Sequence, residues 1–428
     1  MLGQYFAAAS SPLKVKSQSF LLDNAQIIKN IETSNYSDTF LDHLKEMAAA
    51  NTKKSHPSGG QSTALCKRCN ELQATLQIRS ESVCQKCFSQ YIKTKAVKRM
   101  ETYRGKRSTQ VPQKLLLPLS FGPSSSCLLH ILDGYLETQH GRMNRVSYEL
   151  FVVHIDLYLD DADREASAAL LQKYKNQYPR HSYSSYGLQE ALQLEGIGWK
   201  SLGISDLPTQ DAKASSLDLQ KIVSSLSSAT SRADIVSTLL NRLLVDVAKR
   251  NDCESILFGD TTTRLAEKTL TETAKGRGFS LPWQVSDGPS PYGIGFLYPL
   301  RDILKKEIMT FSTSSSPLPE LVVYQAPPSH VSASSKSTTI DDLMAQYFES
   351  VEENFPSIVA NVVRTSSKLK PTTDHISKGC GICGLPVAEG TDGIYGWGGD
   401  QNPDSRPSRE DISSDTVLCY GCSRSING

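Results

Sequence analysis

The cysteines are the residues whose spacing most clearly suggests chemistry. The 428-residue chain contains ten cysteines, and eight of them form four Cys-x-x-Cys pairs: Cys66/Cys69, Cys84/Cys87, Cys380/Cys383 and Cys419/Cys422. Zinc prefers four tetrahedral ligands, and each Cys-x-x-Cys turn places two thiolates on one side of an ion. Neither set encloses a histidine and neither lacks a ligand. The spacing therefore predicts two structural four-thiolate zinc sites, with free thiols, a redox pair or an iron–sulfur cluster as the alternatives.

A basic segment surrounds the first cysteine set. Residues 66–114 contain twelve Lys or Arg and three Glu, whereas the whole chain has a net charge of +1. The cations alternate with Tyr91 and Tyr103, an arrangement that suits RNA phosphates with stacking on the aromatic rings. The alternative is a solvated helix face. The RNA-binding candidates are Lys93, Lys95, Lys98, Arg99, Arg104, Lys106 and Arg107, together with Lys275 and Arg277 of a second basic spot that could equally be a plain helix end.

The third candidate is the loop in LLLPLSFGPSSSCLLHIL, residues 115–132, where an apolar run meets a short turn and then a helical pattern. The amino end of a helix after a strand binds anions, and the candidates here are Ser120, Gly122, Ser124 and Ser125. Phe121 would obstruct close backbone approach, and Pro123 removes an N–H donor. Because neither a P-loop nor a GxGxxG pattern is present, we expect weak or no ATP binding.

The elements that must position these residues alternate between strand and helix patterns. Apolar strand-like runs occur at 115–120, 149–159 and 253–260, and helical patterns occur at 161–174 and 233–250. A helix that starts with threonines after residue 260 should end at Gly276, and residues 293–308 give another strand and helix. Such alternation predicts an α/β fold with a mostly parallel sheet and helices on both faces, flanked by the two cysteine units.

The expected organisation has six parts. These are a flexible arm at 1–60, a zinc unit with a basic helix at 61–110, the α/β domain at 111–311, a Ser/Pro-rich insertion at 312–339, a helical segment at 340–370, and the second zinc unit at 371–428. The chain has no apolar run of membrane-spanning length and no secretory signal. A cytoplasmic location is the expectation.

The loop resembles the SGGxDS pyrophosphate loop of the PP-loop ATP pyrophosphatases, although only its first Ser, one Gly and its last Ser are kept. The whole chain resembles the cytoplasmic tRNA 2-thiolation protein 2 family. The resemblance rests on LCKRCN…VCQKCF with the basic helix, on the GPSSS loop, and on FGDTTTRLAEKTLTETAKGRGFSLP at 258–282. It covers residues 60–428 and implies a degenerate PP-loop fold.

The resemblance also implies a function. It implies a role in 2-thiolation of the wobble uridine of tRNAs for Lys, Glu and Gln, as a heterodimer with the catalytic tRNA 2-thiolation protein 1. The implied sulfur donor is a ubiquitin-related modifier that carries a thiocarboxylate. In the catalytic relatives, paired acids occupy the place of Asp260 and the threonines that follow it, and a CxxCG loop precedes that segment.

This chain lacks those catalytic elements, because residues 224–234 contain no cysteine. We interpret Cys127 and Cys253 as buried thiols. The chain should therefore be a non-catalytic subunit of a sulfurtransferase complex. The alternatives are an ATP-using thiolase that is active alone and a zinc-ribbon adaptor that binds nucleic acid.

Overall fold

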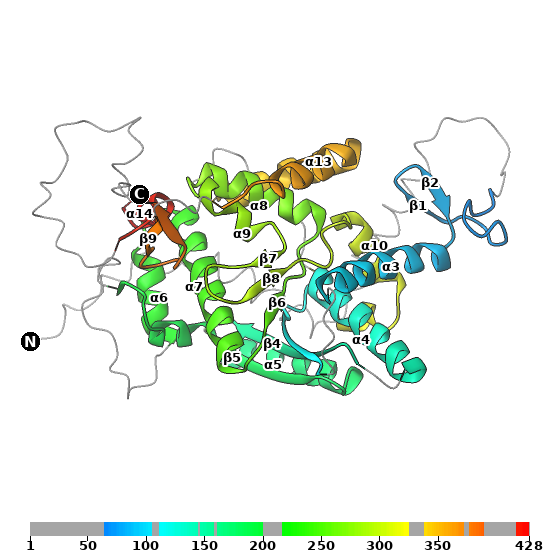
Figure 1. Ribbon diagram of the computed structural model, residues 1–428, viewed down its shortest axis with the longest axis horizontal. Coiled ribbons are helices and arrows are strands. Elements are labelled where there is room, and N and C mark those ends of the chain that lie inside the picture. The colour runs from blue at the N-terminus through cyan, green and yellow to red at the C-terminus, as the bar shows by residue number, and fades with distance from the viewer. Residues whose placement is uncertain are drawn as a thin grey trace, which may run out of the picture. The chain divides into compact units, whose positions relative to one another are not determined.

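The computed structural model describes residues 64–104, 111–143, 146–157, 161–199, 216–324, 338–371, 376–388 and 417–427 (Figure 1). The arm expected at 1–60 lies outside these residues. The chain divides into two parts. The smaller part contributes residues 157 and 161–169, which include the first half of a helix. The larger part holds all the other described residues and every candidate site that the structure describes.

A six-stranded sheet organises the larger part. Its order is β5-β4-β3-β6-β8-β7, and all neighbours are parallel except β7, which runs antiparallel to β8 at one edge. The strands are β3 (Gln113–Pro118), β4 (Tyr148–Asp156), β5 (Ser182–Gly187), β6 (Ser255–Leu257), β7 (Gly288–Pro289) and β8 (Gly295–Leu297). The predicted α/β fold with a mostly parallel sheet is confirmed.

Helices connect the strands, as parallel pairing requires. They are α4 (Pro123–Met143), α5 (Asp161–Gln177), α6 (Ser216–Ser225), α7 (Ala229–Arg250), α8 (Thr262–Ala274), α9 (Leu281–Gln284), α10 (Lys305–Ser314) and α11 (Leu318–Leu321), with short 3-10 turns at η2 (Leu188–Gln193) and η4 (Gly278–Ser280). Thr261 caps α8 by accepting from the backbone N–H of Arg264, and the helix terminates before Gly276, whose φ of +76° favours glycine.

The sheet is buried on both faces. Leu115 and Leu117 of β3 belong to a core that also contains Phe88 and Ile92. Leu116, between them, is fully buried and points to the opposite face. Helix α7 packs against β6, and at least one member of each apolar pair that its sequence repeats every four residues is buried. The amphipathic pattern of α7 therefore predicted its packing correctly.

The two cysteine units add a hairpin and a helix each. The first contains β1 (Leu76–Ile78), β2 (Glu81–Val83) and α3 (Gln85–Arg104), and α3 lies beside α4 and α10 (Figure 1). The second contains β9 (Ile376–Gly379), β10 (Pro386–Ala388) and α14 (Tyr420–Asn427). In the sequence between the sheet and the second unit, the chain forms α12 (Ile340–Asn354) and α13 (Pro356–Ser366), which pack on α8. None of the described helices has the length and apolar composition to cross a membrane.

Candidate metal centres and nucleic-acid interface

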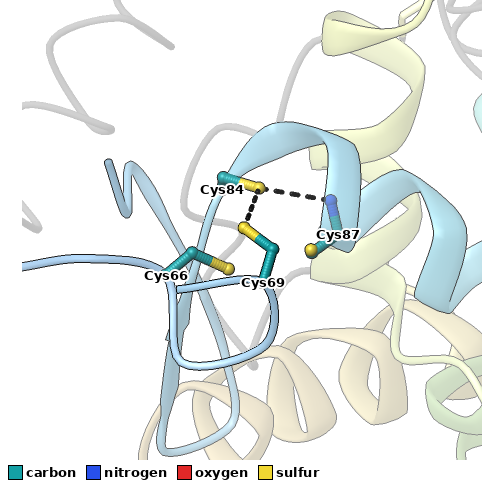
Figure 2. Close-up of side chains that lie close together, drawn as sticks. All are labelled: Cys66, Cys69, Cys84 and Cys87. Atoms are coloured by element: carbon teal, nitrogen blue, oxygen red, sulfur yellow. Dashed lines mark hydrogen bonds between the residues drawn. The ribbon is translucent and has the colours of Figure 1, made fainter. Parts of the chain in front are cut away.

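The first four cysteines converge at the start of α3 (Figure 2). Cys66 and Cys69 lie on a tight turn in which the backbone N–H of Asn70 donates to the carbonyl of Cys66. Cys84 and Cys87 lie at the beginning of the helix, where the N–H of Cys87 donates to the Cys84 sulfur at 3.4 Å. All four sulfurs lie within 4.8 Å of one another. The sequence paired these residues correctly, and the fold brings the pairs together.

The sulfur spacing fits a single tetrahedral ion. With metal–sulfur bonds of about 2.3 Å, tetrahedral geometry separates the sulfurs by about 3.8 Å. The Cys69 and Cys84 sulfurs are 3.9 Å apart. Although burial opposes it, backbone N–H groups near the sulfur lower the pKa of Cys66 to about 6. A thiolate, the form that binds metal, is thus favoured at one position of the cluster.

The second four cysteines form a more enclosed cluster. Cys380, Cys383, Cys419 and Cys422 are all buried, with their sulfurs within 4.8 Å of one another. The sulfurs of Cys383 and Cys419 are 3.8 Å apart, which again matches a tetrahedral ion. The long spacer that the sequence predicted as a loop, residues 389–416, lies outside the described residues. Both clusters could bind metal ions.

The predicted RNA-binding cations of α3 differ in how the fold uses them. Lys98 is exposed, and Lys93 is half-buried. The Lys95 ammonium donates to the carbonyl of Asp302 at 2.7 Å, and Arg99 pairs with Asp287 at 2.9 Å. Arg104 ends the helix, but its side chain lies outside the described part, as do Lys106 and Arg107.

The second predicted basic spot is buried. Arg277 is 2% exposed and forms a two-point ion pair with Asp234, and Lys275 pairs with Asp234 at 3.2 Å and with Asp341 at 2.6 Å. Ser425 of α14 also donates to Asp234. Because these contacts occupy both cations, Lys275 and Arg277 drop out of the RNA-binding surface. Arg277 also lies 3.5 Å from the nearby Glu272, but Asp234 and Asp341 are 41 or more residues from these cations, so charge in the KGRG segment alone gave no sign of the pairing with them.

Three further cations lie beside α3. Together with Lys95, Lys98 and Arg99, they line a cleft of about 440 Å³ between α3, the segment after β8 and α13. They are Arg79, Arg301 and Arg364. Arg79 belongs to the basic segment at 66–114 but was not among the RNA-binding candidates, whereas Arg301 and Arg364 lie far from that segment in the sequence, so no local charge pattern identified them.

The loop after β3, taken with the first residues of α4 as residues 119–125, is held by hydrogen bonds and ring packing within the protein, and we call it the closed loop. The Ser125 hydroxyl accepts from the backbone N–H of Ser120 at 3.2 Å and lies 3.1 Å from the Ser120 hydroxyl. Phe121, with φ of +60°, is buried, and its ring stacks on His154 with centroids 4.2 Å apart. The Phe121 carbonyl accepts from Val323 at 2.9 Å. Gly122 and Ser124 lie at the turn into α4. The Ser120 N–H and the Ser125 hydroxyl, two of the donors that an anion would use here, therefore bond within the protein.

The segment after β6 approaches this loop closely. A Cβ on Gly259 would lie 3.1 Å from the backbone nitrogen of Ser125, so only glycine permits this approach without displacement. The three threonines that follow are engaged in the fold. Thr261 caps α8, the Thr262 hydroxyl donates to the carbonyl of Arg301 at 2.7 Å, and the Thr263 hydroxyl donates to Glu352 at 2.7 Å.

The two remaining thiols are buried in apolar surroundings. Burial raises the pKa of Cys127, which is fully enclosed, and raises the pKa of Cys253 to about 11. A thiol with a raised pKa is a poor nucleophile near neutral pH. Both positions agree with their interpretation as buried thiols.

Sequence comparisons place these features in a family. A family model described as cytoplasmic tRNA 2-thiolation protein 2 matches residues 339–424. A protein of that name from Sclerotinia sclerotiorum is 92% identical over 316 residues, which cover 74% of this chain and 85% of the relative. One from Phaeosphaeria nodorum is 46% identical over 376 residues, covering 86% of this chain and 96% of the relative.

A comparison with solved structures supports the same fold. The U34-tRNA thiolase NcsA from Methanococcus maripaludis, solved with its [4Fe-4S] cluster, aligns with a TM-score of 0.52 at 15% identity. The alignment covers 77% of this chain and 93% of the thiolase. At this identity the likeness concerns the arrangement of strands and helices, which is that of a PP-loop tRNA thiolase.

Proposed function

Because the chain belongs to the cytoplasmic tRNA 2-thiolation protein 2 family, we propose that it acts in the 2-thiolation of the wobble uridine of tRNA. It works in the cytoplasm as a subunit that binds tRNA and pairs with a catalytic paralogue. The tRNAs are those for Lys, Glu and Gln, and the sulfur comes from a thiocarboxylated ubiquitin-related modifier. The chain itself carries out no adenylation and no sulfur transfer.

The closed loop after β3 is the observation that carries this proposal. Thiolation needs ATP to activate the C2 oxygen of uridine, and an ATP site needs free backbone donors at the helix terminus. Here Pro123 removes one donor, the Ser120 N–H is bonded to Ser125, and Gly259 lies against the first turn of α4. The loop therefore retains the fold of a nucleotide site without its open cradle.

The isolated cysteines and the threonines at 261–263 also support a non-catalytic role for this chain. Sulfur transfer needs a reactive thiolate, and the two cysteines outside the clusters are buried with raised pKa values. The threonines at 261–263 are held in structural hydrogen bonds. Neither set of groups is available to activate or attack a substrate.

The two cysteine clusters hold one structural zinc ion each in this proposal. Four thiolates complete the tetrahedral shell, so no position is open for water or substrate. A four-iron cluster would place several metal atoms between the thiolates and would need wider sulfur spacing than 3.8–3.9 Å. The expected metal content of the purified chain is about two zinc ions.

RNA binding is assigned to α3 and the residues that follow it. Lys93, Lys95, Lys98, Arg99 and Arg104 lie on the helix, and Lys106 and Arg107 come directly after it. The first cysteine cluster fixes the start of the helix and so its direction. Phosphate contacts of this kind position an RNA without reading its sequence.

Reconstitution tests the proposal. Thiouridine in tRNA is measured by mass spectrometry after incubation with ATP and the sulfur donor, using this chain alone, the paralogue alone and the two together. We expect thiouridine only with both proteins. Thiolation by this chain alone would establish the solitary enzyme instead. Full thiolation by the paralogue without this chain would show that this chain is an adaptor with no role in the reaction.

A further inference from the structure

The cleft beside α3 concentrates positive charge on one concave surface. Its lining includes Arg79 from the β1–β2 turn, Lys95, Lys98 and Arg99 from α3, Arg301 from the segment after β8, and Arg364 from α13. The acidic residue in the lining is Asp302. Cations from four separate elements thus meet around about 440 Å³ of space.

Three of these cations have no acidic partner among the described residues. Arg79, Lys98 and Arg364 are exposed, and no described carboxylate lies within ion-pair distance of them. Arg364 contacts Asn361 at 3.4 Å. The other two arginines are paired, because Asp287 lies 2.9 Å from Arg99 and 2.7 Å from Arg301, and Asp302 lies 3.9 Å from Arg99. The six cations of the lining thus face two paired acids, so the described cleft keeps a net positive charge.

Lys95 lies in the lining with most of its donors free of protein acceptors. Its ammonium donates to the carbonyl of Asp302 at 2.7 Å in an exposed bond and lies 4.8 Å from the centre of the Tyr91 ring. An ammonium has three donors, so further donors can turn toward an anion in the cleft. The Nε of Arg99 is enclosed and is not among the groups that an anion would reach.

The shape of the cleft favours phosphate over bases. Its described lining contains no aromatic side chain on which a base could stack, and one wall includes the short side chains of Ala360 and Val363 of α13 and of Ser367, which follows the helix. Arginine forks pair with phosphate oxygens in two-point geometry. The cleft therefore offers contacts to charge without contacts to base edges.

We propose that this cleft binds the sugar–phosphate backbone of tRNA, with Arg79, Lys98 and Arg364 as its direct phosphate ligands. The site rests on the proposed function and extends it beyond α3 to the hairpin and α13. Thr262 and Arg301 follow β6 and β8, so the cleft lies beyond the carboxyl ends of these parallel strands. The closed loop follows β3, which neighbours β6, at the same edge of the sheet. Bound RNA is thus held at the edge where the catalytic relatives place their chemistry.

Salt dependence of tRNA binding tests the cleft directly. The full-length variant Arg79→Ala/Arg364→Ala is compared with Lys173→Ala/Lys249→Ala, which removes the same charge from exposed positions outside the cleft. Binding of an unmodified tRNA transcript is measured by fluorescence anisotropy across a salt series. Loss of two phosphate contacts should reduce the slope of log affinity against log salt by about two and weaken binding by on the order of tenfold near 0.1 M salt. The control should match the unaltered chain.

The same series separates the possible outcomes. Poly(U) should show an equal loss, because phosphate contacts do not depend on base sequence. Lys98→Glu should act in the same direction, and circular dichroism verifies that each variant is folded. Equal salt slopes for the cleft and control variants would refute tRNA binding in the cleft but would leave the proposed function intact. Normal tRNA binding with weakened association of the paralogue would also overturn it, because the cleft would then be a protein interface. Absence of tRNA binding by the unaltered pair would instead refute the proposed function.

Discussion

The two cysteine regions both combine four cysteines with basic side chains, but Arg79 and Lys98 are exposed in the first region and Arg277 is buried in the second. In the first region, Cys69 and Cys87 are partly exposed. Arg68 pairs with Glu81 at 2.9 Å, whereas Arg79 and Lys98 face solvent without acidic partners in the described chain. In the second region every cysteine is buried, and the neighbouring Arg277 is enclosed with Asp234. In the second region, acids from distant elements turn basic side chains into part of the fold. In the first region, cations without such acids stay exposed, and these are the ones that we expect to bind RNA.

Metal removal should separate the two regions most strongly. Cys66→Ser should lose one of two zinc ions and loosen the hairpin that carries Arg79, so tRNA affinity should fall. Cys380→Ser should also lose one ion, but it should lower the unfolding temperature more, because its cluster is fully buried. Elemental analysis, thermal unfolding and tRNA binding on both variants provide the measurement. A folded, metal-free wild-type chain would contradict the metal assignment.

The buried ion pair predicts the next largest effect. Asp234→Ala leaves Arg277 and Lys275 buried without their shared partner, which should cost about 3–5 kcal/mol of unfolding free energy. The salt slope of tRNA binding should not change, because neither cation reaches the RNA surface. Urea unfolding and the salt series measure the two quantities. A changed slope of log affinity against log salt in the folded variant would show that Lys275 or Arg277 contributes to RNA binding.

The same acid predicts a pH dependence. Although burial opposes it, Arg277 and Lys275 lower the pKa of Asp234 below its ordinary value. A carboxyl with a lowered pKa in the folded state stabilises the protein above its unfolded pKa of about 3.9 and loses this contribution as the pH falls through the folded pKa. The stability difference between the unaltered chain and Asp234→Asn should therefore be constant above about pH 5 and shrink at lower pH. A difference that does not vary with pH in urea unfolding would show that the charge of Asp234 is not involved.

Elements with a strong local sequence pattern were predicted correctly. The apolar repeat of α7, the threonine caps of α8 and the buried strands β3 and β4 were all predicted from the sequence. β6 was predicted too long, at 253–260 instead of Ser255–Leu257, because the apolar Cys253 and Phe258 on either side extend its hydrophobic pattern. β5, with the sequence SYSSYG, was not predicted, since an edge strand with a half-exposed, polar surface has no hydrophobic signal.

The candidate sites show the same limit. Cysteine spacing identified both clusters, because each pair is local and the ligand set is complete. The cleft depends on Arg79, from the hairpin just before α3, and on Arg301 and Arg364, which only tertiary packing brings beside α3. The burial of Lys275 and Arg277 depends on Asp234 and Asp341 in other helices. Sequence can locate charge, but the fold determines which charges remain available.

Thiouridine content in the reconstituted pair tests the central claim, that this chain contributes binding and not nucleotide chemistry. Ser124→Ala/Ser125→Ala changes the closed loop, and Arg79→Ala/Arg364→Ala changes the cleft. The account predicts that the loop variant, once shown to be folded, keeps nearly all thiolation, whereas the cleft variant loses a large part of it at limiting tRNA. Loss of thiolation in the folded loop variant, with the cleft variant fully active, would contradict the account and identify the loop as a working nucleotide site.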